Sequence, residues 1–487
     1  MSKLREDRRA KLEQMKAAGV APYGAAYPDT SPAGELVASY ADEKEGTPAR
    51  AAGRLMSIRG HGKSTFADLR DWTGKIQVHF GLSRMGEESY GVVKLLDLGD
   101  LVGVEGPLGK TRTGEVTIFA ERLTVLAKSL LPLPEKFHGL RDIETRSRHR
   151  SLDLIANPES MTQALGRSRV VDAVRRFLSD RGFVEVETPM MQVIPGGATA
   201  LPFITHHNAL DIDLYLRISP ELYLKRLLCG GMERVFEINR NFRNEGVSNK
   251  HNPEFTMLEL YQAYADYEVM MALVEEMVTS IARDVTGKMK VQVGELTIDL
   301  SPPWPRVRFA EAMETYAGVD LFDEDAVRGR ARSLEVDGAD TASLIAVIDE
   351  VFKQTVEPNL VNPTFLTHHP AELAPLCRRS PDDPRVSERF EVFAAGFELA
   401  NAYTELNDPA VQRAAFERQL ERRDEGTIGR IDEDFLLALE HGMPPAGGMG
   451  VGIDRLLMLL LGKTSLRDVI LFPLMRPEPP ADGAGSA

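Results

Sequence analysis

The spacing of apolar residues divides the chain into three regions. Residues 3–18 carry apolar side chains at helical spacing among charged ones, which predicts a short amphipathic helix. Between residues 51 and 130, five short segments alternate apolar and polar positions and are separated by glycine-rich turns: 54–58, 64–69, 75–80, 101–104 and 115–119. Five such segments over about 80 residues are typical of a small closed barrel such as the OB-fold.

From about residue 146 the pattern mixes helical and alternating stretches, which predicts an α+β body. Val170, Val174 and Phe177 repeat at helical spacing, and residues 235–245 alternate strictly between apolar and polar side chains. We therefore predict five regions: an N-terminal helix and connecting segment (1–50), an OB-fold (51–130), a linker (131–150), a large α+β domain (151–480) and a flexible tail (481–487).

Composition narrows the class of protein. Hydrophobic residues make up 43% and charged residues 27% of the chain, which excludes a mainly disordered or collagen-like protein. The two cysteines exclude a disulfide scaffold and argue against a structural zinc site. The charged N-terminus lacks the apolar stretch of a signal peptide, and the longest aliphatic run, 456–461, is too short to span a bilayer. We expect a soluble cytoplasmic protein with no membrane partner.

Charge is distributed unevenly along the chain, whose net charge is −15. Residues 1–150 hold 24 Lys and Arg against 20 Asp and Glu, whereas residues 151–487 hold 34 against 53. The strongly acidic whole argues against nonspecific binding to nucleic acid. The basic excess of the first third still permits a local site for a polyanion there.

Two arginines stand where an anion could bind. Arg243 lies on the polar face of the alternating stretch 235–245. Arg455 follows the glycines of 448–452, in the first turn of a helix predicted over 453–461 and ended by Gly462. A helix N-terminus with an arginine in its first turn suits a phosphate, although such a glycine stretch is more often simple turn chemistry.

A pair of glutamates predicts a magnesium site. Residues 390–399 read as a hairpin that turns at 394–396, which would bring Glu391 and Glu398 roughly opposite each other. Facing like charges destabilise a hairpin unless a cation neutralises them. Mg²⁺ held by carboxylates and substrate phosphates would do so, and two splayed surface carboxylates are the alternative.

Further acidic residues accompany these groups. Glu259 and Tyr261 share one face of an alternating stretch, and Asn401, Tyr403 and Glu405 share another. Two arginines and a metal suit a phosphoryl group, while the leftover carboxylates suit a cationic substrate. The sequence contains no Ser-His-Asp order and no evident nucleophile, so we expect electrostatic positioning of a reacting phosphate.

Three runs of residues resemble the signature motifs of class II aminoacyl-tRNA synthetases. The first is 182–189, the second 242–246 with 251–256, and the third 448–455. Further runs resemble the bacterial-type class II lysyl-tRNA synthetases, and the resemblance covers nearly the whole chain, barrel included: 203–208, 214–225, 259–267 and 401–408.

This resemblance implies an OB-fold that binds the anticodon, followed by a catalytic domain built on an antiparallel β-sheet flanked by helices. It implies a homodimeric lysine–tRNA ligase for translation, with L-lysine, ATP and lysine tRNA as substrates. One or more Mg²⁺ ions would serve as cofactor, and no DNA partner is expected. Lysine and ATP would give lysyl-adenylate and pyrophosphate, and the lysyl group would pass to the 3′-terminal adenosine of the tRNA.

The resemblance also assigns roles to individual residues. For ATP, Arg243 and Arg455 would act on the phosphates as the catalytic residues, and Phe255 would stack on the adenine. The other nucleotide-binding positions are Glu245, His251, Asn252 and Gly452. The metal ligands would be Glu391 and Glu398. Lysine would be bound by Gly197, Glu221, Glu259, Tyr261, Asn401, Tyr403 and Glu405, and the anticodon by Arg59, Phe66 and Gln77.

Three alternatives stay open at this point. An aspartyl- or asparaginyl-tRNA synthetase would need a cationic pocket in place of Glu259 and Glu405. A paralogue that lysylates a protein would lack the barrel, and an inert RNA-binding relative would not retain both arginines and both metal carboxylates. The chain departs from the family pattern at Leu201, where an arginine is usual, and at Ser147 and Ser151, which replace two tyrosines.

Overall fold

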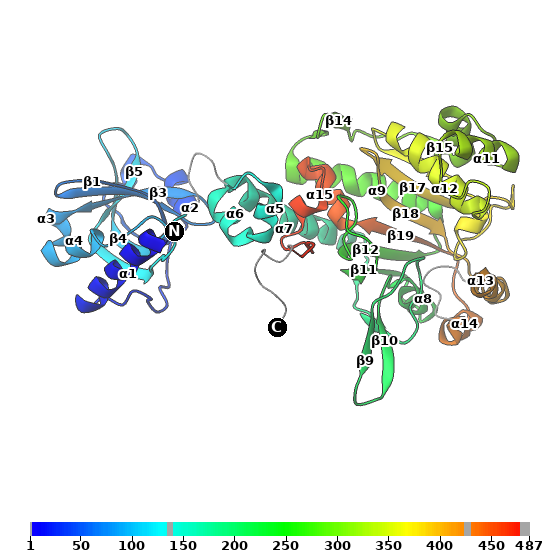
Figure 1. Cartoon of the computed structure of the whole chain (residues 1–487), viewed down its shortest axis with the longest axis horizontal. Helices are drawn as coiled ribbons and strands as arrows, with labels where there is room; N and C mark the ends of the chain where they lie inside the picture. Colours follow the sequence, from blue (N-terminus) through cyan, green and yellow to red (C-terminus); the bar gives the residue numbers. More distant parts are fainter. Residues whose placement is uncertain (1, 134–139, 423–429, 478–487) are drawn as a thin grey trace. The chain divides into compact units, whose positions relative to one another are not determined.

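The computed structural model describes residues 2–133, 140–422 and 430–477. The chain forms two compact units, Met1–Met161 and Thr162–Ala487, whose elements are labelled in Figure 1. We describe each unit by itself.

A barrel dominates the described part of the first unit. Six strands form one sheet in the order β1-β2-β3-β5-β4-β6, and β1 also pairs with β4, which closes the barrel. The five predicted segments are confirmed as β1 to β5, and β6 is an additional strand. The elements are α1 (Ser2–Ala17), α2 (Ala33–Ala38), β1 (Pro48–His61), β2 (Ser64–Arg70), β3 (Lys75–Gly81), α3 (Leu82–Met85), α4 (Glu87–Val93), β4 (Leu101–Lys110), β5 (Val116–Ala120), β6 (Arg122–Ala127), α5 (Ile143–Arg148) and α6 (Arg150–Ala156).

Alternation along the strands fills the barrel interior. In β2, Ala67 and Leu69 are buried inside, whereas Phe66 and Asp68, which alternate with them, are half-buried on the outer face. The predicted N-terminal helix is confirmed as α1, whose Met15 is fully buried in the barrel core. The predicted OB-fold is therefore present, with its helix packed against it.

An eight-stranded sheet, counted within the described residues, forms the centre of the second unit (Figure 1). It is antiparallel apart from the parallel pairs β15–β16 and β7–β11 at its two edges. In spatial order its strands are β15 (Arg306–Arg308), β16 (Thr364–Thr367), β17 (Arg389–Ala394), β18 (Phe397–Thr404), β19 (Ala446–Gly452), β12 (Glu254–Ala263), β11 (Arg234–Phe242) and β7 (Val184–Glu185).

The two faces of this sheet have different chemistry. On one face, apolar residues such as Phe236, Leu258 and Val451 pack against α7 (Pro158–Ser179), α9 (Tyr267–Ile281) and α15 (Ile453–Leu461). The other face carries polar side chains, and helix α8 (Glu221–Cys229) packs there. The strict alternation of residues 235–245 thus places an apolar core on one side and polar groups on the other.

The remaining elements surround the sheet. They are β8 (Met191–Gln192), β9 (Ile204–His207), β10 (Ile212–Leu216), β13 (Lys290–Val293), β14 (Leu296–Asp299), α10 (Phe309–Ala312), α11 (Glu324–Ser333), α12 (Leu344–Thr355), α13 (Pro409–Arg422), α14 (Glu433–Glu440) and α16 (Leu466–Val469), with short 3₁₀ or π turns at Ala282–Thr286, Met313–Ala317, Glu357–Asn359 and Ala371–Leu373. A further 3₁₀ turn, Asp42–Lys44, belongs to the first unit.

The structure bears out the predicted fold class, an OB-fold barrel followed by an antiparallel sheet flanked by helices. The predicted tail 481–487 and part of the predicted linker lie outside the described residues. In the parts of the chain that the structure covers, no helix is long and apolar enough to cross a membrane.

Candidate active site

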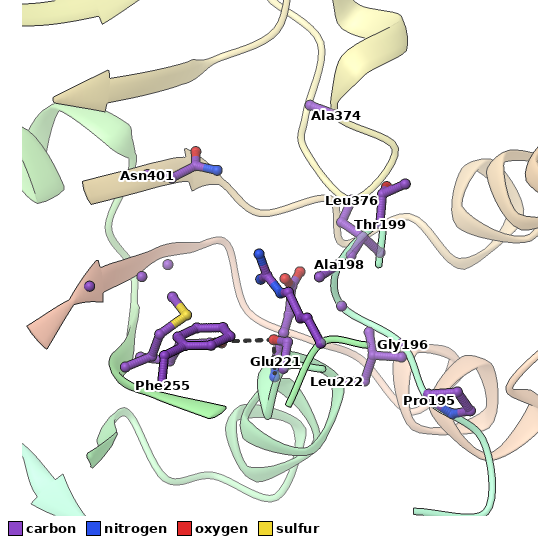
Figure 2. Close-up of a pocket in the computed structure, with 18 of the residues that line it drawn as sticks. Pro195, Gly196, Ala198, Thr199, Glu221, Leu222, Phe255, Ala374, Leu376 and Asn401 are labelled. Atoms are coloured by element: carbon purple, nitrogen blue, oxygen red, sulfur yellow. Dashed lines mark hydrogen bonds between the residues drawn. The ribbon is translucent and has the colours of Figure 1, made fainter. Parts of the chain in front are cut away.

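A cavity of about 440 Å³ opens on the polar face of the large sheet. Figure 2 shows Glu221 from α8, Phe255 from β12 and Asn401 from β18 around it, with residues 195–199 along another wall. Most of the residues predicted from the sequence for this domain line the cavity: Gly197, Glu221, Arg243, Glu245, His251, Asn252, Phe255, Glu259, Tyr261, Glu391, Glu398, Asn401, Tyr403, Gly452 and Arg455.

Glycines of β19 form the floor of the cavity. This strand pairs with β12 on one side and β18 on the other, and Gly448, Gly450 and Gly452 occupy alternate positions that line the cavity. Gly450 lies between Glu259 and Asn401, and Gly448 lies between Tyr261 and Tyr403. The predicted glycine-rich turn is therefore a strand, and its missing side chains leave the space into which the flanking residues project.

One end of the cavity is acidic. Ser219 Oγ donates to Glu259 Oε1 at 2.8 Å, and Tyr261 Oη donates to Glu259 Oε2 at 3.2 Å. Burial and then the neighbouring Glu221 charge raise the pKa of Glu259 to about 8. A buried carboxyl with a raised pKa gains from an ammonium group placed beside it, so this end suits a cation.

Glu405 differs from the expectation that it would meet the substrate directly. Of the residues described, it is not among those that line the cavity, and it is only 1% exposed. Its Oε2 lies 2.5 Å from Nζ of Lys225, which also contacts Glu221 Oε1 at 2.6 Å. Glu405 thus already faces an ammonium group of the chain itself.

The other end of the cavity carries arginines. The Arg243 guanidinium lies 5.1 Å from the centre of the Phe255 ring, and its buried Nε has no hydrogen-bond partner among the described residues. Arg455 Nη1 lies 3.0 Å from Glu398 Oε2, and its Nη2 lies 3.5 Å from His251 Nε2. Arg243 is therefore open to an anionic ligand, whereas Arg455 is held by Glu398.

The start of α15 fixes the place of Arg455. Asp454 Oδ2 accepts a hydrogen bond from the backbone N–H of Thr256 at 2.8 Å. Its Oδ1 forms an ion pair with Arg167 Nη1 at 2.5 Å. These contacts tie the helix start to β12. The predicted helix 453–461 is confirmed, with Gly462 in the left-handed conformation at its end.

The two predicted metal carboxylates are offset by two positions along the hairpin. Glu398 pairs with Phe393 because the turn pairs Ala394 with Phe397, and Glu391 pairs with Asn401 beyond a register shift at which Leu399 is an extra residue. A bulge of this kind re-aims side chains, and both carboxylates line the cavity.

The chain's own cations neutralise these carboxylates. Arg389 Nη2 lies 2.5 Å from Glu391 Oε1, and His369 Nε2 lies 3.3 Å from its Oε2. The positive charge of Arg389 outweighs burial, so the pKa of Glu391 is lowered to about 2. Mutual repulsion therefore does not by itself require a metal here. Within the described residues, no group of three or more His, Cys, Asp or Glu could hold one, so a metal at Glu391 and Glu398 would take further ligands from substrate or water.

The barrel carries a row of side chains on its outer face. Strand pairing sets Arg59 beside Phe66, Phe66 beside His79, and His79 beside Phe119. The Phe66 and His79 rings lie 4.6 Å apart. Gln77 is 7% exposed, and its amide donates to Glu115 at 2.9 Å and accepts from Thr117 at 3.0 Å. Arg59 and Phe66 are thus presented outward, whereas the Gln77 amide on the same face is engaged with Glu115 and Thr117.

Comparison with known proteins agrees with this architecture. Residues 142–476 match the family described as tRNA synthetases class II (D, K and N), and residues 49–126 match the OB-fold nucleic acid binding domain. A lysine–tRNA ligase of Pelotomaculum thermopropionicum is 52% identical over 486 residues, covering 98% of this chain and 96% of that protein. The chain belongs to the class II tRNA synthetases, in the lysine–tRNA ligase group.

Two other relatives of this synthetase have similar coverage. The lysine–tRNA ligase of Moorella thermoacetica is 53% identical, and that of Bacillus subtilis is 49% identical, each covering 96% of both chains. The resemblance in the signature motifs is thus confirmed at the level of family.

Sequence reasoning missed several residues that line the synthetase's cavity or pair with its lining residues. Arg389 stands two positions before Glu391 and so shares its strand face, and Lys225 stands four positions after Glu221 on α8, within ion-pair reach. Both spacings were visible in the sequence. Lys250, which also lines the cavity, pairs with Glu357 at 2.9 Å, and no local pattern signals that contact.

Replacing Glu259 with Gln should stabilise the free synthetase increasingly as pH rises. Since the folded pKa of about 8 exceeds the unfolded value of 4.5, the native state binds more protons between these values, and stability falls as pH increases. The variant lacks this titration. Its gain in free energy of unfolding over the wild type should therefore be about 2–4 kcal/mol larger at pH 8 than at pH 5. Chemical denaturation at both pH values measures the effect. Exposed Glu295→Gln is the control, and an equal gain at both pH values would contradict the prediction.

Proposed function

We propose that this synthetase activates L-lysine with ATP and transfers the lysyl group to the 3′-terminal adenosine of lysine tRNA. The observation that carries the proposal is one cavity with buried carboxylates at one end and arginines at the other. The acidic end suits the ammonium groups of lysine, and the arginine end suits the phosphates of ATP. The high identity to lysine–tRNA ligases over nearly the whole chain supports the same reading.

Lysine would lie across the glycine floor. Glu221 and Gly197 would bind its α-ammonium, and Glu259 with Tyr261 would bind its ε-ammonium, with Glu405 acting from its place against Gly448. Tyr403 would contact the aliphatic stem, and Asn401 would lie beside the carboxylate. This places the lysine carboxylate toward the arginines, because Asn401 shares its sheet row with Glu391.

ATP would occupy the arginine end. Phe255 would stack on the adenine, Glu245 would accept from its amino group, and His251, Asn252 and Gly452 would lie beside the nucleotide. A lysine carboxylate oxygen attacks the α-phosphorus, the bond from that phosphorus to the pyrophosphate oxygen breaks, and pyrophosphate leaves with the bonding electron pair. Arg243 and Arg455 would stabilise the charge that spreads over the phosphate oxygens in this step.

Glu391 and Glu398 fit a magnesium site in their donor chemistry. Both are carboxylates on the wall of the cavity, the ligand type that Mg²⁺ prefers together with substrate phosphates. When bound, one or more Mg²⁺ ions would neutralise phosphate charge. Arg389 and Arg455 would give up part of their contact with these carboxylates on binding.

The second step needs tRNA. We propose that Arg59 and Phe66 on the barrel's outer face contact the anticodon, with Phe66 stacked on a base and Gln77 reading a base edge after release from Glu115. We also propose a homodimer that works in the cytoplasm, with no membrane or DNA partner.

The rival functions fit the cavity less well. Aspartate or asparagine would leave the buried Glu259 without a cationic side chain to face. An inert RNA-binding relative would have no use for Arg243 and Arg455 beside a pair of carboxylates in one cavity.

Amino-acid-dependent exchange of pyrophosphate into ATP tests the activation step. Among the standard amino acids, lysine should give the strongest signal, because it alone supplies a second primary ammonium at full reach. Ornithine, one methylene shorter, should be disfavoured by about 1–3 kcal/mol. Dominant exchange with aspartate or asparagine would refute the proposal.

Glu391→Gln should raise the Mg²⁺ concentration for half-maximal exchange by about tenfold or more, since partners in metal sites act on this scale. It should also lower stability by about 3 kcal/mol, because Arg389 loses its buried partner. Glu357→Gln is a matched control, since Glu357 pairs with the cavity residue Lys250 without lining the cavity itself. An unchanged magnesium titration of the Glu391 variant would remove the proposed metal role.

Phe66→Ala should separate charging of tRNA from activation of lysine. Loss of one stacking platform, worth about 1–3 kcal/mol per base, should lower the kcat/KM for tRNA about tenfold and leave pyrophosphate exchange intact. Phe80→Ala is the control for a barrel core position, because Phe80 is 1% exposed and its loss should unfold the barrel early. A Phe66 variant that melts early but charges tRNA normally when folded would make Phe66 a core residue only.

A further inference from the structure

Lys225 is a fully buried cation that the proposed mechanism does not use. Its side chain is 0% exposed on α8, and its Nζ lies 2.6 Å from Glu221 Oε1 and 2.5 Å from Glu405 Oε2. Burial alone would lower the pKa of this ammonium, but the two carboxylates outweigh it, and the pKa is raised. Lys225 therefore carries a positive charge in the interior.

Lys225 lies behind the wall of the cavity. Lys225 and Glu405 do not line the cavity, whereas Glu221 and Gly448 do. A Cβ built on Gly448 would lie 1.9 Å from Glu405 Oε1, so the Glu405 carboxylate sits directly against this glycine of the floor. Of the two carboxylates that contact Lys225, Glu221 therefore lines the cavity itself. Glu405 does not line it but lies against Gly448, which does and which has no side chain.

The net charge of the buried groups around Lys225 indicates how many positive charges a ligand must bring. Three carboxylates, Glu221, Glu259 and Glu405, gather here, and Lys225 is the cation that contacts two of them. With all of them ionised, the cluster carries three negative charges and one positive charge. Two further ammonium groups would balance it, and uncompensated charge in a buried site is costly.

We propose that Lys225 is a positioning residue that sets the charge of the amino-acid site, so that a ligand with two ammonium groups, and not one, balances it. This inference rests on the proposed function, since lysine carries one α- and one ε-ammonium. Lys225 acts through Glu221 and Glu405 and touches no reacting atom. Without its charge, three carboxylates would face two ammonium groups, and one carboxylate would have to take up a proton.

The fold uses the same arrangement elsewhere as a plain support. In the barrel, the fully buried Lys128 lies 2.6 Å from Asp97 and 2.8 Å from Asp100, and none of the three lines the cavity of the other unit. Lys128→Met is therefore a matched control: it removes a buried lysine between two carboxylates without altering an amino-acid site.

The test compares Lys225→Met, Lys225→Arg and Lys128→Met in the full chain by lysine-dependent pyrophosphate exchange between pH 6 and 9. Lys225→Met should raise the KM for lysine at least tenfold at pH 7, with kcat within threefold and the KM for ATP unchanged. Its kcat/KM for lysine should also rise at a higher pH, by about one unit, because the carboxylates keep their protons to a higher pH without a neighbouring positive charge, and lysine needs one ionised carboxylate for each of its two ammonium groups. Lys225→Arg should keep the wild-type pH profile, and Lys128→Met should lower only the thermal stability.

Other results would overturn the inference. If Lys225→Met keeps the wild-type KM and pH profile while it melts earlier, Lys225 is a support like Lys128. If that variant does not fold, Lys225→Arg decides, and a pH profile shifted by a unit despite the retained charge would refute the proposal. Absence of lysine-dependent exchange in the wild-type chain would instead refute the proposed function itself.

Discussion

Backbone pairing across the glycine strand β19 is the constraint on which the site depends. This strand joins β12 to β18, so residues far apart in the chain meet on one sheet face in fixed register. A side chain at Gly448 or Gly450 would occupy the space between the flanking residues; a Cβ at Gly448 would lie 2.5 Å from the Tyr261 ring. The sheet therefore both builds the walls and keeps the floor clear.

Four carboxylates in or next to the cavity are paired with cations of the chain itself. Arg389 holds Glu391, Arg455 holds Glu398, and Lys225 holds Glu221 with Glu405. Removing one partner of a buried pair is costly, because the other charge is left uncompensated. These internal ion pairs hold the side chains of the site in place. A ligand that binds to one of these charged groups must therefore replace part of its ion-pair contact. Arg243 differs, since its buried Nε has no partner within the described residues.

Strand register also decides which side chains the barrel presents on its outer face. Alternation along β2 and β3 sends apolar side chains such as Leu69, Val78 and Phe80 inward and leaves Phe66 and His79 on the outer face. The aromatic row is therefore a direct product of strand register. Its neighbour Gln77 is on the same side of the sheet but is held by Glu115 and Thr117, so proximity in the sheet alone does not make a residue available to a ligand.

The sequence by itself determined the local elements and the chemistry they bring. Period-two alternation identified five barrel strands and residues 235–245, and helical spacing with a terminal glycine identified 453–461, because these patterns depend only on neighbouring residues. Tertiary structure decided the rest. The turn pairs Ala394 with Phe397, so Glu398 stands opposite Phe393 and is offset by two positions from Glu391. Glu405 pairs with Lys225 and does not line the cavity, because a buried carboxylate needs a cation beside it. The packing of α8 against the sheet decides which cation that is.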